Sequence, residues 1–431
     1  MRWLNNLKNN KSLQETSIKP FKGVVYNLAN ITDASRVMCP PYDVINSEQQ
    51  DYYYSKSPYN FIRLDLNKSD KSDSEQNNRY TRSVAFFNDW LRDNILKQNK
   101  DEAIYFYKQD YFCNSKEYSR VGFIALLELK DSGGVYPHEN THAAAKLDRL
   151  ELTKKIKANL SPIFTIFEDK KKAVKNIFNK EFSHKEPEFL LKDVDGVRNS
   201  IWRLTDKDKI EYIKKNLADK QIFIADGHHR YEVSSNYRNL MKAEDKNYSL
   251  DKSYNYVMTY FTPLDSSSLT IFPIHRLIKT EIDISKLYDN FKISRLSSVF
   301  DLEEKLLSFS NKKCVFGVYQ DEKIFLLELK DKKKINCDFM SKKCFKNLNV
   351  AILDYYVLNE LLKVDKNAII YTKQISEAKE SVDKKEVTCA FILKPTTVEE
   401  IRDVALQGEK MPPKSTYFYP KLLSGLVVHK F

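Results

Sequence analysis

The sequence has no long apolar run. Among its 431 residues, no stretch approaches the roughly 18–20 consecutive apolar residues that a membrane-spanning helix needs. The N-terminal segment MRWLNNLKNN also lacks the apolar core of a signal peptide. We therefore expect a cytoplasmic protein that makes no contact with a membrane.

Cysteines are few and scattered, and none forms a C-x-x-C pair. This pattern argues against a cysteine-based zinc cluster and against a disulfide framework, so we expect reduced thiols. The six residues are Cys39, Cys113, Cys314, Cys337, Cys344 and Cys389.

Positive charge is abundant but is not gathered into one segment. The chain has 71 Lys and Arg against 59 Asp and Glu, a net charge of +12 that could attract nucleic acid or anionic metabolites. Lysine runs such as Lys170–Lys172 and Lys332–Lys334 are short, and acids stand elsewhere along the chain. Because no helix-turn-helix segment carries a clustered basic face, we do not expect nucleic acid as a partner.

The composition is that of a soluble globular protein, with 42% apolar and 30% charged residues. A chain of this length can bury a large core and form more than one domain. Segments of strand spacing alternate with segments of helical spacing, which predicts a mixed α/β (α+β) fold. Expected strands include Phe61–Leu66 and Val121–Leu129, and an expected helix is Val84–Leu96.

The most polar cluster follows a short apolar segment. Ile222–Ala225 have the continuous apolar character of a buried strand, and Asp226–Arg230 follow directly. Beyond them, Tyr231, Tyr237 and Leu240 recur at roughly helical spacing. The cluster is therefore predicted to lie where a strand turns into a helix, a junction that can hold an anion.

Each residue of this junction has a chemical use at a phosphate site. Asp226 can cap the helix, and Gly227 lets the backbone approach a ligand closely. His228 and His229 accompany the first N–H groups of the helix, which carry partial positive charge. Arg230 adds a planar, bidentate donor for phosphate or carboxylate. The alternative is an ordinary Asp-Gly turn next to surface or core histidines.

Two earlier segments supply further candidates. Pro40 and Pro41 forbid a helix and fix an extended backbone that presents Tyr42 and Asp43, either to line a site or as part of a rigid connector. Arg149 lies at the charged start of an expected helix.

The segment HENTH at His138–His142 formally matches H-E-x-x-H, in which two histidines one helical turn apart bind zinc. Gly133 and Gly134 precede it, so it starts as a loop, and no third ligand is obvious on a following helix. We therefore do not expect zinc here, but His138 and Glu139 remain candidates as a pair of site residues.

The C-terminal segment is richer in functional groups than most termini. Lys414, Ser415 and Thr416 offer an ammonium and two hydroxyls, the groups that phosphate binding uses, and the aromatic run Tyr417–Tyr419 follows. Ordering such residues at a terminus costs backbone entropy unless they dock. We predict that Lys414 shares a cleft with the Asp226–Arg230 junction. The alternative is an aromatic clamp that serves packing only.

Two domains follow from these expectations. The N-terminal α/β domain would span residues 1–265 and carry the Asp226–Arg230 junction. The C-terminal α/β domain would span residues 266–431, and its last 25 residues would fold back toward the site.

A series of sequence blocks along almost the whole chain resembles domain-of-unknown-function family 1015 (DUF1015), in the order of that family. The blocks are PFKGVVYN, PPYDVI, SPYNFIRLDL, PHENT, DRLEL, ANLSPIF, IWRLTD, IADGHHRYE, PIHRL and MPPKSTYFYPKLLSGLV. After PHENT the chain departs from the family's proline-rich pattern, so we interpret His142 as incidental.

The family itself implies no firmly assigned activity. At one remove, ADGHHRY is similar to the ligand motif of the ParB/sulfiredoxin superfamily, whose members place such a turn on nucleotide phosphates. Free serine kinases are the most similar in motif, through Asp-Gly-His-His-Arg. This resemblance implies a ParB/sulfiredoxin-like core with an additional α/β C-terminal part.

We interpret the chain as a nucleotide-dependent phosphotransferase, a kinase of a small hydroxyl-bearing metabolite such as an amino acid or hydroxy acid. ATP or ADP would bind with Mg²⁺ bridging the phosphates. The alternatives are a ParB-like nucleotide switch that binds nucleic acid or protein, and a hydrolase of phosphate or acyl esters.

The candidate residues divide by role. Asp226 would orient a histidine or hold the metal, and Glu139 or Asp43 would accept the hydroxyl proton. The catalytic candidates are Asp226, His228, His229, Glu139 and Asp43. The cofactor-binding candidates are Gly227, Arg230, His138, Arg149, Lys414, Ser415 and Thr416.

Overall fold

The chain folds into two compact units. The computed structural model describes residues 15–431 except 132, 265–268, 311–312, 333–334, 336–342 and 346, so Cys337 lies outside the described residues. Unit 1 comprises Met1–Tyr136, Thr141–Leu269 and Pro420–Phe431. Unit 2 comprises Pro137–Asn140 and Thr270–Tyr419. The chain therefore passes between the units more than once.

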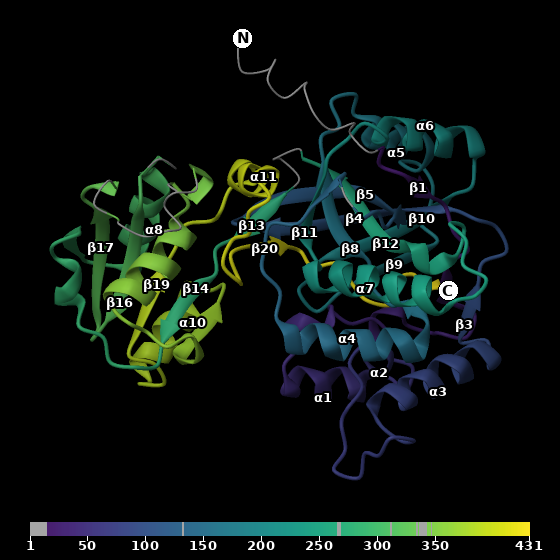
Figure 1. The fold of residues 1–431 in the computed structure, drawn as a ribbon, viewed down its shortest axis with the longest axis horizontal. Coiled ribbons are helices and arrows are strands. Elements are labelled where there is room, and N and C mark those ends of the chain that lie inside the picture. The colour runs from purple at the N-terminus through teal and green to yellow at the C-terminus, as the bar shows by residue number, and fades with distance from the viewer. Residues whose placement is uncertain are drawn as a thin grey trace. The chain divides into compact units, whose positions relative to one another are not determined.

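Unit 1 is built on a nine-stranded mixed sheet, in which β1 pairs with β5 beside the path β6-β11-β8-β12-β5-β4-β10-β9 (Figure 1). The pairs β6–β11 and β8–β12 are parallel, and the others are antiparallel. The bounds are β1 Ile18–Lys19, β4 Ile104–Cys113, β5 Lys116–Glu128, β6 Val135–Tyr136, β8 Ile163–Phe167, β9 Phe189–Lys192, β10 Arg198–Leu204, β11 Ile222–Asp226 and β12 Tyr256–Pro263.

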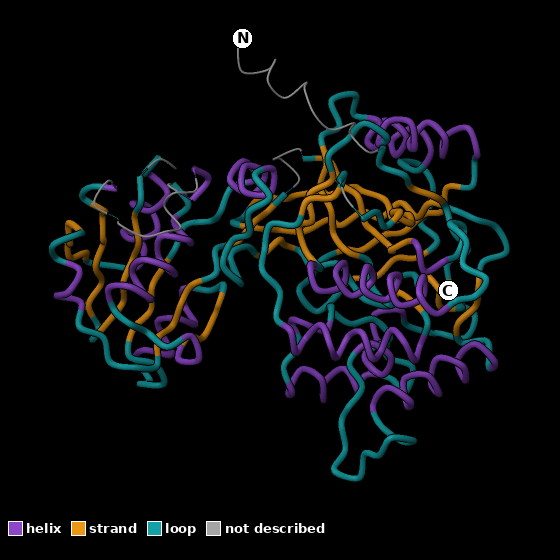
Figure 2. Tube along the Cα trace, viewed as in Figure 1, coloured by secondary structure: helices purple, strands orange, loops and turns teal. Residues whose placement is uncertain are grey.

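Helices cover both faces of this sheet (Figure 2). On one face, α5 and α6 pack against alternating strand residues such as Phe123, Ala125 and Leu127. On the other face lies α7, followed outward by α4 and α3. The bounds are α1 Ser47–Lys56, α2 Ile62–Asp65, α3 Arg79–Arg92, α4 Ala143–Ile156, α5 Ala173–Glu181, α6 Lys207–Leu217 and α7 His228–Glu244.

The expected strand at Phe61–Leu66 is wrong, because this segment forms the short helix α2. Asn60 starts the turn by accepting the N–H of Ile62 through Oδ1 at 3.0 Å. The apolar residues Ile62 and Leu64 are buried together with Asp65. So short a run fits either period, and periodicity alone could not separate strand from helix.

The end of the chain is part of the core of unit 1. The strand β21 (His429–Lys430) pairs with β7 (Ala158–Asn159), and Val428 exchanges backbone hydrogen bonds with Val24. Val24 lies in β2 (Val24–Tyr26), which pairs with β3 (Leu96–Gln98). Val427 and Val428 are each 1% exposed, so these last residues fill interior space.

Unit 2 is built on a six-stranded antiparallel sheet in the order β15-β17-β16-β19-β14-β18. Helices α8 and α10 pack on one of its faces. A separate ribbon pairs β13 with β20. The bounds are β13 Thr270–Phe272, β14 His275–Ile278, β15 Phe291–Leu296, α8 Val299–Ser308, β16 Val315–Gln320, β17 Lys323–Leu329, α9 Asn349–Ala351, a π-helical segment Ile352–Leu361, β18 Ile369–Thr372, α10 Ile375–Asp383, β19 Cys389–Ile392, α11 Val398–Leu406 and β20 Tyr417–Tyr419.

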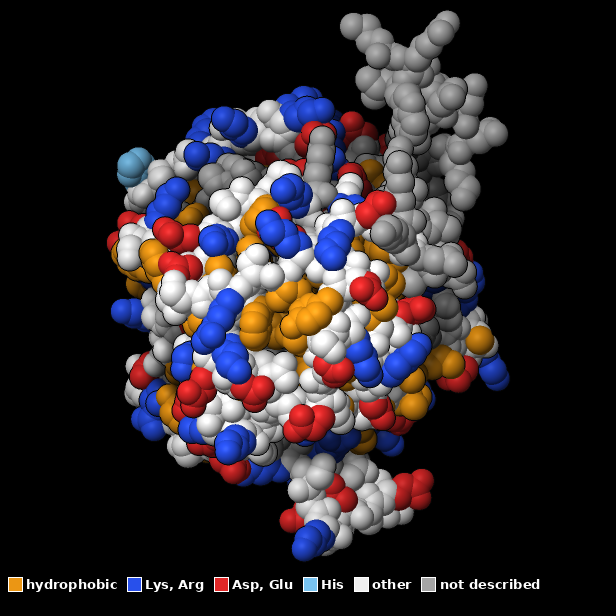
Figure 3. Space-filling view, turned by 90° about the vertical axis from the view of Figure 1, so that its left-hand side faces the viewer, with side chains coloured by type: hydrophobic (Ala, Val, Ile, Leu, Met, Phe, Trp, Pro, Cys, Tyr) orange, Lys and Arg blue, Asp and Glu red, His pale blue; other side chains and the backbone are white. Residues whose placement is uncertain are grey.

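The prediction of a mixed α/β fold is confirmed by both units. None of the described helices is long and apolar enough to cross a membrane. On the face drawn in Figure 3, Lys and Arg side chains are interspersed with Asp and Glu, so this face carries no continuous basic patch.

Candidate functional site

The junction after β11 is a strand–turn–helix, as the sequence predicts. The strand ends at Asp226, and α7 begins at His228. Gly227 between them has a φ of 89°, in the left-handed region that other residues rarely adopt. A Cβ atom at this position would lie 3.0 Å from Cζ, Nε and Nη2 of Arg230. The turn therefore needs glycine both for its backbone and for the approach of the Arg230 guanidinium.

Asp226 is paired with two cations. Its Oδ2 accepts from Nη2 of Arg230 at 2.7 Å, and its Oδ1 accepts from Nζ of Lys421. Burial raises the pKa of Asp226, but Lys421 and then Arg230 more than offset this, so the pKa lies well below its usual range. His228, which is buried, lowers that pKa further. Asp226 is consequently ionised at neutral pH.

Lys421 is held in place through its backbone. Arg120 donates from Nη2 to the carbonyl of Pro420 at 2.5 Å, and Gln109 donates to the carbonyl of Lys421 at 3.0 Å. Both Arg120 and Gln109 are fully buried in the sheet. Sequence reasoning missed Lys421, because nothing local to position 421 indicates a partner at position 226.

The guanidinium of Arg230 is directed at groups of the protein itself. Besides Asp226, it donates from Nη1 to Oγ of Ser161 at 3.3 Å and to the carbonyl of Pro162. Arg230 therefore joins the turn to the start of β8, and its two Nη atoms already donate to groups of the protein. A direct role of Arg230 in binding phosphate stays a prediction.

His229 is oriented by the segment that leads into α4. The backbone N–H of His142 donates to Nε2 of His229 at 2.8 Å, and the two rings stack with centroids 6.1 Å apart. A neutral imidazole that accepts at Nε2 carries its proton on Nδ1. Thr141 and Lys146 both bind Oε2 of Glu232 one turn further along α7. The hydrogen bond to His229 comes from the main chain of His142, so the interpretation of the His142 side chain as incidental stays a prediction.

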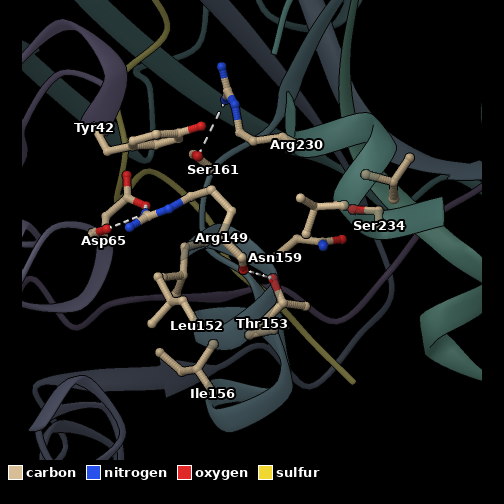
Figure 4. Close-up of a pocket in the computed structure, with 14 residues that line it drawn as sticks. Tyr42, Asp65, Arg149, Leu152, Thr153, Ile156, Asn159, Ser161, Arg230 and Ser234 are labelled. Carbon is tan, nitrogen blue, oxygen red and sulfur yellow. Dashed lines mark hydrogen bonds and ion pairs between the residues drawn. The ribbon is translucent and has the colours of Figure 1, made fainter. Parts of the chain in front are cut away.

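A small cavity lies beside the turn within unit 1 (Figure 4). Its volume is about 40 Å³, and its lining includes Tyr42, Asp65, Arg149, Ser161 and Arg230. The structure thus brings Arg149 and the Pro40-Pro41 segment to the same place as the turn. Asp43, the neighbour of Tyr42, has an exposed side chain.

Arg149 is the centre of an ion-pair network at this cavity. Its Nη2 lies 2.6 Å from Oδ2 of Asp148, and its Nη1 lies 3.4 Å from Oδ1 of Asp65. Its guanidinium lies 4.1 Å from the centroid of the Tyr42 ring. Sequence reasoning missed Asp65, because it was assigned to a strand and because Ser424, which donates to its Oδ2 at 2.9 Å, is far away in the sequence.

Unit 2 collects a second set of candidates. Glu139 accepts the backbone N–H of Lys414 through Oε1 at 2.8 Å, and Nε2 of His138 lies 3.3 Å from Oγ1 of Thr416. Ser415 donates to the carbonyl of Pro412 at 2.6 Å. The prediction that Lys414 shares a cleft with the Asp226–Arg230 junction stays a prediction.

The residues of HENTH do not have the arrangement of a zinc motif. His142 precedes the first residue of α4, so the two histidines of this segment do not share one face of a helix. Among the described residues, no group of three or more His, Cys, Asp and Glu side chains could hold a metal. The proposed metal role of Asp226 would require Lys421 or Arg230 to release an oxygen.

The fold and the site together define a two-unit α/β protein with a glycine-dependent, cation-rich turn at the start of a long helix. The chain belongs to the family described as protein of unknown function (DUF1015), whose model matches residues 18–356. A comparison with curated proteins found no match.

Several solved structures are similar to parts of the chain. A conserved hypothetical protein from Pyrococcus furiosus is 16% identical, with a TM-score of 0.33 over 67% of this chain and 89% of that chain. A free serine kinase mutant in complex with ADP is 15% identical, with a TM-score of 0.34 over 66% and 84%. SbnI from Staphylococcus aureus, with a C-terminal truncation, is 10% identical, with a TM-score of 0.35 over 70% and 85%. Because these TM-scores are low, the function is argued below from the residues of this chain.

Proposed function

We propose that the protein is a nucleotide-dependent phosphotransferase that acts on a small hydroxyl-bearing metabolite. The observation that carries this proposal is the turn at Gly227, where the half-buried carboxylate of Asp226 holds two cations at the start of α7. The three steps below give the reasons for phosphate binding, for charge neutralisation and for proton transfer.

The start of α7 suits a phosphate group. The first N–H groups of a helix have no acceptor within the helix and carry partial positive charge. The helix is 17 residues long, and Gly227 presents no side chain that would keep a ligand away from these groups. Backbone donors of this kind hold the phosphates of a nucleotide without further side chains.

Lys421 supplies mobile charge at the same place. Arg230 is tied to Asp226, Ser161 and Pro162, whereas Lys421 holds Asp226 through a flexible side chain and a compact ammonium. We infer that Lys421 turns from Asp226 to a phosphate oxygen when nucleotide binds, while Arg230 keeps Asp226 ionised and paired. Phosphoryl transfer depends mainly on positioning and on such charge neutralisation.

Proton transfer and metal binding are the remaining steps of the reaction. The side chains available for them are the carboxylates of Glu139, Asp43 and Asp226 and the imidazole of His229. We keep Glu139 and Asp43 as candidates for the base that accepts the hydroxyl proton, and His229 as a donor from Nδ1 to phosphate. Mg²⁺ keeps several of its waters and binds largely through substrate phosphates, so Asp226 can stay paired with Arg230. The nucleotide supplies the phosphoryl group that is transferred.

A binding screen tests the proposal directly. The purified protein is titrated with ATP, ADP, CTP and GTP, with and without Mg²⁺, and turnover is then measured with hydroxy acids and amino acids. We expect tight binding of ATP or ADP and transfer to a hydroxyl compound. Hydrolysis of phosphate or acyl esters without nucleotide would favour the hydrolase alternative, and retention of DNA that depends on CTP or GTP would favour the switch.

A further inference from the structure

The cavity beside the turn has no part in holding the nucleotide in the function proposed above. Its volume of about 40 Å³ leaves room for about three water molecules. A nucleobase or a sugar ring is larger than this space. A group of a few heavy atoms, such as a carboxylate with its adjoining carbon, has the right size.

The charges around the cavity favour an anion. Arg149 and Arg230 both line it, and only one carboxylate, Asp65, lines it with them. Burial raises the pKa of Asp65 more than Arg149 and Ser424 lower it. Two groups of ion pairs adjoin the cavity: Arg79 and Arg149 are balanced by Asp65 and Asp148, whereas Arg230 and Lys421 share the single carboxylate of Asp226.

One end of the cavity gathers hydrogen-bond donors. Figure 4 shows the hydroxyls of Tyr42 and Ser161 near the guanidinium of Arg230. Because Oγ of Ser161 accepts from Arg230, its own proton is available to a ligand. Nε of Arg230 is buried and has no hydrogen-bond partner among the residues that the structure describes. A buried donor of this kind costs free energy until an acceptor reaches it.

The other end of the cavity is apolar. Leu152, Ile156 and Val257 line it, and Figure 4 shows Leu152 and Ile156 on the side of Arg149 away from Tyr42. An anion that carries a short carbon chain satisfies both ends. Inorganic phosphate, which has about two negative charges and no carbon, can bind the donors at the polar end but makes no contact with the apolar end.

We propose that this cavity binds the carboxylate of a small hydroxy acid or amino acid, and that it thereby selects the acceptor of the phosphoryl group. The term acceptor rests on the proposed function, whereas the binding of a small carboxylate does not. Tyr42 and Ser161 are then residues that determine specificity.

Calorimetric titration with paired ligands tests this assignment on the unaltered protein. D-glycerate and L-serine carry a carboxylate, whereas glycerol and ethanolamine replace it with a neutral group or with hydrogen. Each ligand is titrated alone and in the presence of ADP and Mg²⁺. We expect the two acids to bind and the two counterparts to bind at least about tenfold more weakly, since a charged hydrogen-bond partner is lost.

Two single-atom variants locate the binding. Tyr42→Phe and Ser161→Ala each remove one hydroxyl, and each is expected to weaken the acid roughly five- to tenfold. Tyr54→Phe is the matched control, because the hydroxyl of Tyr54 binds Asn67 at 2.8 Å and does not line the cavity. Its affinity for the acids should equal that of the unaltered protein.

The outcomes separate this inference from the proposed function. Equal binding of glycerol and glycerate, or tighter binding of inorganic phosphate at the same place, would overturn the assignment of the cavity to a carboxylate. Binding of ADP in the same experiment would still support the proposed function. Binding of the acids without any binding of nucleotide would contradict the proposed function but would still support the assignment of the cavity to a carboxylate. If either variant fails to fold, the ligand pairs on the unaltered protein still decide the question.

Discussion

At the scale of single residues, Gly227 has two separate requirements that a pair of variants can distinguish. Replacing a left-handed glycine costs about 1–2 kcal/mol through the backbone alone. Gly196, also in unit 1, has a φ of 79°, and a Cβ there would meet only Cε of Lys192 at an ordinary 3.6 Å. We expect Gly227→Ala to lower the free energy of unfolding in urea by more than Gly196→Ala, because only Gly227 faces the Arg230 guanidinium. Equal losses would show that the approach of Arg230 is unimportant.

Lys421 should affect ligand binding more than folding. Lys421→Met keeps most of the side-chain volume and removes the charge, so we expect the affinity for ADP to fall by about tenfold or more. Lys170→Met serves as the control, because Lys170 pairs with Glu168 on an exposed face. Calorimetric titration measures both variants. An affinity for ADP that is unchanged in Lys421→Met would remove Lys421 from the phosphate site.

The paired state of Asp226 should appear in the acid stability of the protein. Because the folded pKa of Asp226 is lowered, its ionised form stabilises the fold fully above the ordinary carboxyl pKa of about 4. That stabilisation is lost as pH falls from there toward the lower folded pKa. We expect the stability difference between the unaltered protein and Asp226→Asn to be constant near neutral pH and to shrink below about pH 4. A difference that grew with acid would contradict the ion pairs.

At the scale of elements, sequence patterns predicted those whose signal is long or chemically distinct. The strand before Asp226, the helix after Gly227 and the strand at Val121–Leu129 all show such patterns and are confirmed. The segment Phe61–Leu66 failed because a few alternating residues fit two periods. Its correct form matters, since α2 places Asp65 at the cavity.

The last residues form an element on which unit 1 depends. Residues Leu426 to Val428 are each at most 4% exposed, and β21 closes against β7. We expect deletion of residues 426–431 to expose the core, so that limited proteolysis cuts unit 1 at concentrations that leave the full chain intact. Phe431→Ala, which removes one ring stacked on Tyr237 at 5.4 Å, is a milder control. A truncated chain as resistant as the full one would contradict this role of the C-terminus.

At the scale of the whole molecule, site residues come together from distant parts of the sequence. The pairs Asp226–Lys421 and Asp65–Ser424 join positions that are 195 and 359 residues apart. Residue chemistry alone could indicate position 226 as a candidate site residue. It could not predict these partners, because tertiary pairing leaves no local pattern in either segment.

Lys414 tests whether both units serve one reaction. Its backbone N–H binds Glu139, and its φ of 57° is in the left-handed region, where a residue other than glycine is strained. We expect Lys414→Ala to lower turnover far more than the midpoint of thermal unfolding, because the substitution leaves that backbone bond in place. Lys410→Ala, on the same segment, is the comparison. Full turnover in Lys414→Ala would exclude Lys414 from the reaction.

The return of the chain end into unit 1 has a consequence for how the protein is made. Residues 270–419 are synthesised before Pro420–Phe431, so the ribosome needs roughly 8–30 seconds to pass from the main body of unit 1 to its closing segment. During that time β7 lacks its pairing strand β21, and Asp226 lacks its ion-pair partner Lys421. A nascent chain that stops early therefore lacks both its last core strand and the lysine of its site. The candidate site of unit 1 is therefore assembled only after the whole of unit 2 has been synthesised.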